Sequence, residues 1–87
     1  MIYPSQTLGK FLKNRREELN LTQRQVANRL KYSASQYVSG WEKGTLAPPV
    51  AKIPALVKAL KLDRKKFASI VRKDTMRAVQ AELSRIL

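Results

Sequence analysis

Apolar residues recur three or four positions apart along almost the whole chain, and this spacing limits what the chain can fold into. One face of the first such segment carries Leu8, Phe11, Leu12 and Leu19, as expected of a helix with one buried side. No stretch alternates apolar and polar residues as a half-buried strand would, and the chain has only three glycines. The sequence therefore predicts an all-α fold, a compact bundle of five or six helices with short connections.

Capping residues and helix breakers divide this pattern into separate helices. Thr22 and Gln25 have the spacing of a capping box, which marks the start of a helix. Asn20 tolerates a left-handed conformation and is expected to end the helix before it, and Ser33 is expected to cap the helix that follows the next turn. The helices predicted in this way cover residues 7–19, 22–31, 34–43, about 51–60 and a fifth segment that begins at Asp63.

The tail from Asp74 to Leu87 contains no helix breaker. A heptad-like strip runs along it, formed by Met76, Val79, Leu83 and Ile86. Two interpretations remain open: the strip completes the core of the monomer, or it pairs with a second copy of the chain. The predicted organisation is a domain over residues 1–73, followed by a C-terminal helix over residues 74–87 that is a candidate dimerisation element.

The charge of the chain predicts its kind of partner. Eighteen Lys and Arg against six Asp and Glu give a net charge of +12. A small domain this basic is expected to bind a polyanion, first nucleic acid and second an anionic membrane surface. A charge that serves solubility alone is the third interpretation.

The absence of two residue types argues against catalysis. The chain has no Cys and therefore no disulfide and no thiolate metal site. It also has no His, the commonest general base and the commonest metal ligand. We therefore expect no enzyme, no metal and no cofactor. No segment has the pattern of a signal peptide or a membrane span, so a cytoplasmic protein with no membrane partner is expected.

The most specific pattern lies between residues 19 and 49, where two short helices are joined by a turn of about four residues. Such a pair can place its second helix in the major groove of DNA, although a generic helical bundle can also contain one. The residue order resembles the phage-repressor and Cro-type (XRE-like) helix-turn-helix family in the segments Leu21-Thr22-Gln23, Val26-Ala27-Asn28-Arg29-Leu30, Tyr37 to Gly44, and Pro48-Pro49. The resemblance extends from about Leu8 to Phe67. The turn is one residue longer than usual, and Lys31 stands where the family usually has Gly.

This resemblance implies a lambda-repressor-like fold with its motif at about residues 22–43. It also implies a sequence-specific, double-stranded-DNA-binding transcriptional regulator, in the commonest case a repressor, that binds a two-fold operator as a homodimer. No small-molecule effector is expected in so short a chain. The alternative is an RNA-binding or basic interaction module.

The outward face of the third helix is expected to contact bases, because Val38 and Trp41 occupy its buried face. Gln36 can form a bidentate pair with adenine through its amide. Gly40 has two interpretations: a missing side chain that allows close approach to bases, or drift at an exposed site. The predicted base contacts are Ser35, Gln36, Ser39 and Gly40.

The resemblance implies a second set of residues that hold the DNA backbone. The predicted phosphate contacts are Gln23, Arg24, Lys31, Tyr37, Lys43 and Thr45. For Tyr37, packing of the ring inside the domain is an alternative to a phosphate contact. The resemblance also implies a structural ion pair between Arg16 and Glu42 beneath the motif.

Overall fold

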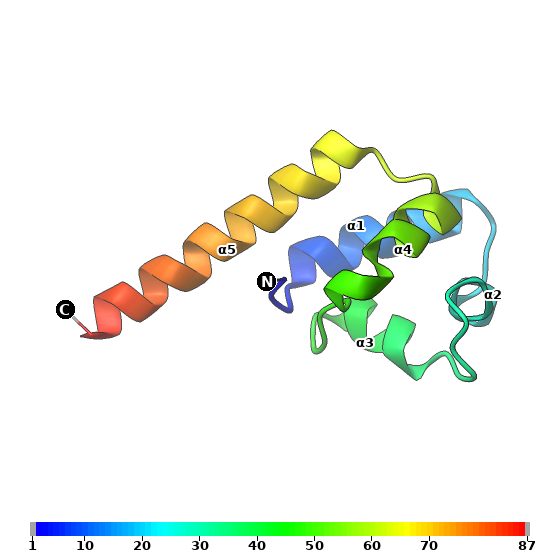
Figure 1. The fold of residues 1–87 in the computed structure, drawn as a ribbon, viewed down its shortest axis with the longest axis horizontal. Coiled ribbons are helices and arrows are strands. Elements are labelled where there is room, and N and C mark those ends of the chain that lie inside the picture. Colours follow the sequence, from blue (N-terminus) through cyan, green and yellow to red (C-terminus); the bar gives the residue numbers. More distant parts are fainter. Residues whose placement is uncertain (1, 87) are drawn as a thin grey trace.

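Five α-helices and one short 3₁₀ turn follow one another along residues 2–86, the part of the chain that the computed structural model describes (Figure 1). No strand occurs in that range, so the all-α prediction is confirmed. Met1 and Leu87, which the predicted domain ranges include, lie outside the described residues. The elements are α1 (Gln6–Glu18), α2 (Gln23–Arg29), α3 (Gln36–Lys43), η1 (Val50–Lys52), α4 (Ile53–Leu60) and α5 (Arg64–Ile86).

The starts of α1 and α2 follow from side-chain caps. The backbone N–H of Leu8 donates to Ser5 Oγ at 2.9 Å. At α2 the predicted capping box is present: the N–H of Gln25 donates to Thr22 Oγ1 at 3.0 Å, and the N–H of Thr22 donates to Gln25 Oε1 at 2.8 Å. These bonds satisfy backbone donors that have no partner within the first turn of a helix.

Left-handed residues end the first, second and fourth helices. Asn20 has a φ of 56°, as its predicted role as terminator requires, and Lys31 and Lys61 have φ values of 65° and 48°. Gly44 closes α3 with a φ of 79°. Lys31 therefore adopts a conformation that glycine adopts at far lower cost, which explains why the related family usually has Gly there.

The third helix begins later than predicted. It starts at Gln36, its N-cap residue is Ser35 in place of the predicted Ser33, and Ser35 makes no side-chain cap hydrogen bond. The reason lies in the preceding turn, where the Tyr32 ring packs 4.9 Å from the Tyr37 ring and 5.9 Å from the Trp41 ring between centroids. The chain needs residues 33–35 to return from this aromatic cluster to the helix axis, so the helix cannot begin at Ala34.

The core lies where α1 crosses the other helices. The buried apolar side chains come from all five helices and from the connection before α5, so each helix has one face fixed in the same cluster. Burial of each large apolar side chain contributes about 1.5–3 kcal/mol. The cluster consists of Leu8, Leu12, Val26, Ala27, Leu30, Val38, Trp41, Leu56, Leu60, Leu62 and Phe67.

The last helix passes through the predicted boundary at residues 73 and 74 without a break. Its first half packs on the core through Phe67, whereas its second half projects past the N-terminal end of α1 (Figure 1). The four residues of the C-terminal strip are exposed: Met76 by 59%, Val79 by 43%, Leu83 by 49% and Ile86 by 73%. The interpretation that they complete the monomer core is therefore wrong. Across residues 2–86 no helix combines the length and hydrophobicity that a membrane crossing would need.

Candidate nucleic-acid interface

Two short helices, α2 and α3, form a protruding pair at the end of the molecule opposite the projecting half of α5 (Figure 1). They pack through Val26, Ala27 and Leu30 on one side and Val38 and Trp41 on the other, the residues that sequence periodicity predicts to be buried. Trp41 is only 2% exposed, so it is a core residue and not a base-stacking platform.

The opposite side of α3 is open. Gln36, Tyr37 and Lys43 are exposed, and Ser35 and Ser39 are half-buried. Tyr37 is 46% exposed, so its ring edge and hydroxyl remain accessible although one side of the ring lies on Tyr32. Gln36 is therefore accessible to a partner and Ser35 and Ser39 are partly accessible; their role as base contacts stays a prediction.

Gly40 is the exception on this helix, and its predicted outward placement is wrong. The residue is buried, and a Cβ atom built there would lie 2.5 Å from Leu46 Cδ1. The loop after α3 folds back over it, because the N–H groups of Thr45 and Leu46 both donate to the Gly40 carbonyl oxygen, at 3.0 and 3.2 Å. The glycine thus makes room for Leu46 of the same chain.

The ion pair expected between Arg16 and Glu42 is present and joins three helices. Arg16 Nε lies 2.6 Å from Glu42 Oε2, and Arg16 Nη2 donates to Glu42 Oε1 at 3.0 Å. Gln23 Nε2 also donates to Glu42 Oε1, at 2.9 Å. This network fixes the start of α2 against the end of α3, and so it orients the whole helix pair.

The network is largely shielded from water. The Glu42 side chain is 4% exposed and the Arg16 side chain 12%. The hydrogen bond to Glu42 raises the pKa of the Arg16 guanidinium, and this outweighs the lowering by burial. Arg16 Nη1 also donates to the Leu21 carbonyl oxygen at 2.8 Å, which ties the α1–α2 connection to the same centre.

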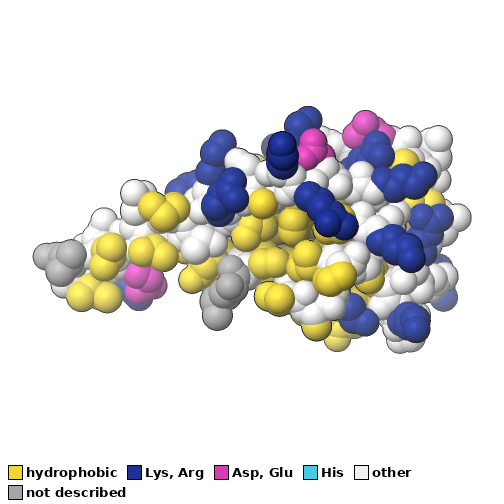
Figure 2. Space-filling view, turned by 45° about the horizontal axis from the view of Figure 1, so that its top comes forward, with side chains coloured by type: hydrophobic (Ala, Val, Ile, Leu, Met, Phe, Trp, Pro, Cys, Tyr) yellow, Lys and Arg dark blue, Asp and Glu magenta, His cyan; other side chains and the backbone are white. Residues whose placement is uncertain are grey.

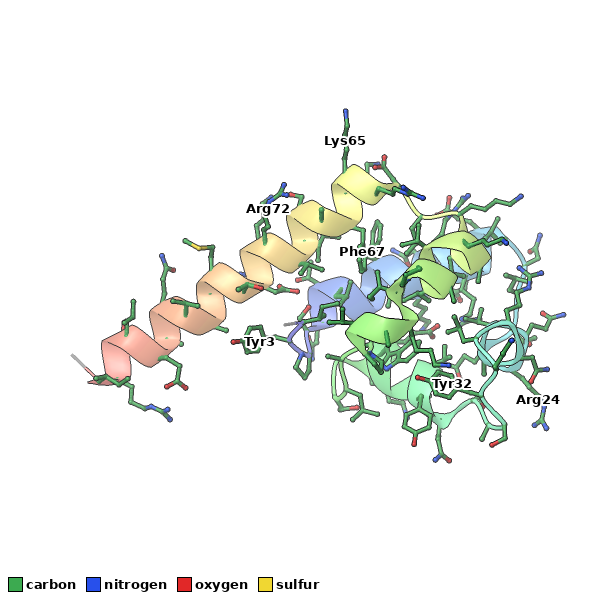
Figure 3. The ribbon with its side chains drawn as sticks, viewed as in Figure 1. Tyr3, Arg24, Tyr32, Lys65, Phe67 and Arg72 are labelled. Carbon is green, nitrogen blue, oxygen red and sulfur yellow. The ribbon has the colours of Figure 1, made fainter. Side chains whose placement is uncertain are left out.

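Not every cation on this surface is free to meet a phosphate. Three of them donate to carbonyl oxygens at the C-terminal ends of α2 and α4, where positive charge is stabilising. These are Arg15 to Leu60, Arg29 to Ala59 and Lys52 to Leu30, at 3.0, 3.2 and 2.9 Å. By contrast, Arg24, Lys31 and Lys43 are exposed and make no ion pair within the described residues. Figure 3 shows Arg24 directed outward from α2.

Sequence reasoning missed the role of Tyr32 and its neighbour Lys52. The Lys52 ammonium lies 4.8 Å from the centroid of the Tyr32 ring, a cation–π contact that helps hold the turn between α2 and α3. Burial raises the pKa of the Tyr32 phenol, with a smaller contribution from Tyr37. In the sequence, the feature that could have indicated this contact was an aromatic residue, Tyr32, inside a turn longer than usual.

The helix α3 has one face buried against α2 and one polar face open to solvent. Two short helices packed in this way are the arrangement of a helix-turn-helix DNA-binding domain, whose second helix enters the major groove. The chain belongs to the family described as "Helix-turn-helix domain", which matches residues 7–69. It is therefore a DNA-binding transcriptional regulator and not an enzyme.

Two solved structures share this fold. One is a single-residue variant of the restriction-modification controller protein C.Esp1396I, with 19% identity, a TM-score of 0.60, and coverage of 79% of this chain and 86% of that chain. The other is the clp gene regulator ClgR from Corynebacterium glutamicum, with 22% identity, a TM-score of 0.64, and coverage of 92% and 85%. Among curated proteins, none matches this chain. The neighbours support the lambda-repressor-like, all-α fold class.

Proposed function

We propose that this regulator is a sequence-specific repressor that binds a two-fold operator as a homodimer, with α3 in the major groove. The observation that carries the proposal is the accessible polar face of α3, with Gln36 exposed at its first turn. In helix-turn-helix proteins the N-terminal residues of the second helix contact base edges. The network of Arg16, Glu42 and Gln23 would hold that face in a fixed orientation.

Gln36 is the principal base reader in this proposal. Its amide can donate to and accept from adenine at the same time, and a good bidentate pair contributes about 1–3 kcal/mol of discrimination. Ser35 and Ser39 flank it and discriminate less, because a hydroxyl can either donate or accept. Gly40 is left out of the base contacts, since Leu46 covers it.

The phosphate contacts surround this face. Gln23 uses one amide N–H on Glu42, and its second N–H would donate to a phosphate oxygen while the network holds the side chain in place. Arg24, Lys31 and Lys43 would add charge, and Tyr37 and Thr45 would add hydroxyl contacts. Such contacts position the protein on any duplex and carry no sequence information themselves.

The C-terminal strip is the proposed dimerisation surface. Met76, Val79, Leu83 and Ile86 make up four of the seven large hydrophobic residues exposed on the described part of the chain. Figure 2 shows apolar side chains along the projecting part of α5, as well as over the middle of the body of the domain, where Lys and Arg surround them. Pairing two such helices would remove the strips from water and give a two-fold arrangement of reading helices.

Selection of bound duplexes from a random pool tests the proposal. The wild-type chain should enrich two half-sites related by two-fold symmetry, with centres about 34 Å apart or a multiple of that. Gln36→Ala should lose preference at one base pair per half-site, by about 1–3 kcal/mol. Gln23→Ala should weaken all sequences to a similar degree, and Gln80→Ala on α5 is the matched control. Equal or better binding to structured RNA at the same salt concentration would contradict the proposal.

The assembly and the sign of regulation need separate measurements. Leu83→Glu should convert the dimer to a monomer in sedimentation, whereas Ser84→Glu, on a different face of the same helix, should not. In transcription in vitro, placing the selected operator across a promoter should lower transcript yield when the protein is added. An unchanged or increased yield would refute repression and leave the DNA-binding function standing.

A further inference from the structure

One hydrogen bond joins the residue before α1 to the middle of α5. Ser5 Oγ donates to Asp74 Oδ2 at 2.6 Å, across a sequence separation of 69 residues. Asp74 is 6% exposed, and its side chain, 5% exposed, is buried about as deeply as that of Glu42, 4% exposed. Because Ser5 also caps α1, this bond attaches α5 directly to the N-terminal end of α1. We refer to the pair Ser5 and Asp74 as the clamp.

The clamp lies where α5 leaves the domain. Before it, Phe67, Ile70 and Val71 pack on the core. After it, residues 79–86 are all exposed. Beyond the clamp, Tyr3 and the segment of α5 from Ala78 to Leu83 line a shallow groove. Figure 3 shows Tyr3 directed toward that part of α5. The clamp is therefore the last buried polar attachment before the C-terminal strip.

The carboxylate has little other support at this position. Its second oxygen lies 3.5 Å from Arg77 Nη2, and the Arg77 side chain is 64% exposed, so water screens the pair on the arginine side and weakens it. The first turn of α1 contains no acidic residue, so Asp74 supplies the negative charge that a helix N-terminus favours. The bond with Ser5 is therefore the shortest polar contact of this carboxylate, and it adds to the packing of Phe67, Ile70 and Val71 in holding α5 against the N-terminal end of α1.

We propose that Asp74 is a positioning residue that sets the half-site spacing accepted by the regulator. By fixing the direction of the projecting half of α5 relative to α3, the clamp fixes the distance and rotation between the two reading helices of a dimer. This inference rests on the proposed homodimer. It adds a determinant of operator choice that touches neither DNA nor the partner chain.

The geometry makes spacing sensitive to small changes at the clamp. The helix continues for 12 residues beyond Asp74, to Ile86, which is about 18 Å at 1.5 Å per residue. A tilt of the whole helix α5 by about 10° moves its far end by about 3 Å relative to Asp74 over that length. This displacement is close to the rise of about 3.4 Å per base pair of duplex DNA. Loss of the clamp would therefore let the dimer accept spacings that differ by a base pair or more.

The experiment compares Asp74→Ala, Asp74→Asn and Arg77→Ala on the full chain. Asp74→Ala removes the acceptor, Asp74→Asn keeps an acceptor oxygen for Ser5, and Arg77→Ala removes only the exposed pairing. Each protein is measured for helicity, for dimerisation by sedimentation, for binding to a duplex with one half-site, and for binding to duplexes whose two half-sites are separated by varied spacers. A second variant, Ser5→Gly, removes the donor while glycine still serves as an N-cap, in case Asp74→Ala does not fold.

We expect helicity, dimerisation and single-half-site binding to stay within about twofold of wild type, because no residue of either interface changes. Binding at the best spacing should weaken about tenfold in Asp74→Ala, a fraction of the avidity of about 10²–10⁴ that linked sites provide. The preference over neighbouring spacings should flatten. Asp74→Asn and Arg77→Ala should keep the wild-type preference.

Three outcomes overturn the inference, and they can be told apart. If wild type prefers one spacing and Asp74→Ala or Ser5→Gly keeps that preference, the clamp does not set the spacing and the proposed homodimer stands. If wild type sediments as a dimer but shows no preference among spacings, the inference fails and the homodimer stands. If wild type sediments as a monomer and binds two half-sites no more tightly than one, the homodimer proposal itself fails and the inference fails with it.

Discussion

Replacing Glu42 by leucine should destabilise the domain far more than loss of a surface ion pair would. The Glu42 carboxylate is 4% exposed and accepts three hydrogen bonds, two from Arg16 and one from Gln23. Without it, the guanidinium of Arg16 keeps only the Leu21 carbonyl oxygen as a partner. Removing one partner of a buried pair costs about 3–5 kcal/mol, because a charge is left uncompensated.

This cost is large for so small a chain. At about 0.05–0.15 kcal/mol per residue, a chain of 87 residues has a stability of about 4–13 kcal/mol. Since 1 kcal/mol shifts the Tm of a domain this size by about 4–8 °C, the Tm of Glu42→Leu should fall by about 12 °C or more. Urea unfolding followed by helical circular dichroism measures the free energy of unfolding directly.

A double-mutant cycle separates the buried charge from simple loss of packing. Arg16→Met should also be destabilising, since it leaves the Glu42 carboxylate with Gln23 alone. The double variant removes both charges, and apolar replacement of a whole buried pair is often close to neutral. Its cost should therefore be at least about 2 kcal/mol smaller than the sum of the two single costs. Additive costs, or single costs below about 1 kcal/mol as for exposed pairs, would refute the reasoning.

Four further measurements test the structure and the DNA proposal. Lys31→Gly should raise the Tm by about 2–8 °C, because glycine relieves a left-handed residue at a gain of about 0.5–1 kcal/mol; an unchanged or lower Tm would contradict this. Gly9→Ala should cost about 1–3 kcal/mol in urea unfolding, since its Cβ would lie 2.5 Å from the Glu42 backbone oxygen. Gly40→Ala should cost less, because Leu46 is 44% exposed and its side chain can turn away; equal costs would count against this account. DNA affinity should fall by about 10³–10⁵ between 50 and 200 mM salt for 6–10 phosphate contacts, and a flat dependence would exclude the proposed phosphate contacts.

Local sequence signals predict the elements whose ends are set by local bonds. Thr22 and Gln25 form the capping box that their spacing indicates, and Asn20 takes the left-handed conformation expected of it. The start of α3 was predicted wrongly because distant contacts decide it. The Tyr32 ring packs on Trp41, nine residues away in the sequence, and no capping rule contains that contact.

The two other differences have the same origin. Helical spacing shows that Gly40 lies one turn after Gln36, but it does not show that Leu46 of the following loop folds over it. Likewise, the spacing of the C-terminal strip indicates an apolar face without indicating what covers that face. Periodicity defines which residues share a side of a helix, whereas tertiary packing decides which side meets the core.

The composition of the proposed reading surface bears on why a dimer would be needed. The accessible face of α3 offers one amide, Gln36, and two hydroxyls, Ser35 and Ser39. One good bidentate pair supplies about 1–3 kcal/mol of discrimination, whereas selectivity of specific over nonspecific sites typically amounts to about 4–10 kcal/mol. A single half-site read by so few groups falls short of that range. Two half-sites bound together double the number of base contacts, and a fixed spacing adds selectivity that no single half-site can provide. On this reasoning, the direction of α5 matters to operator choice as much as the side chains of α3.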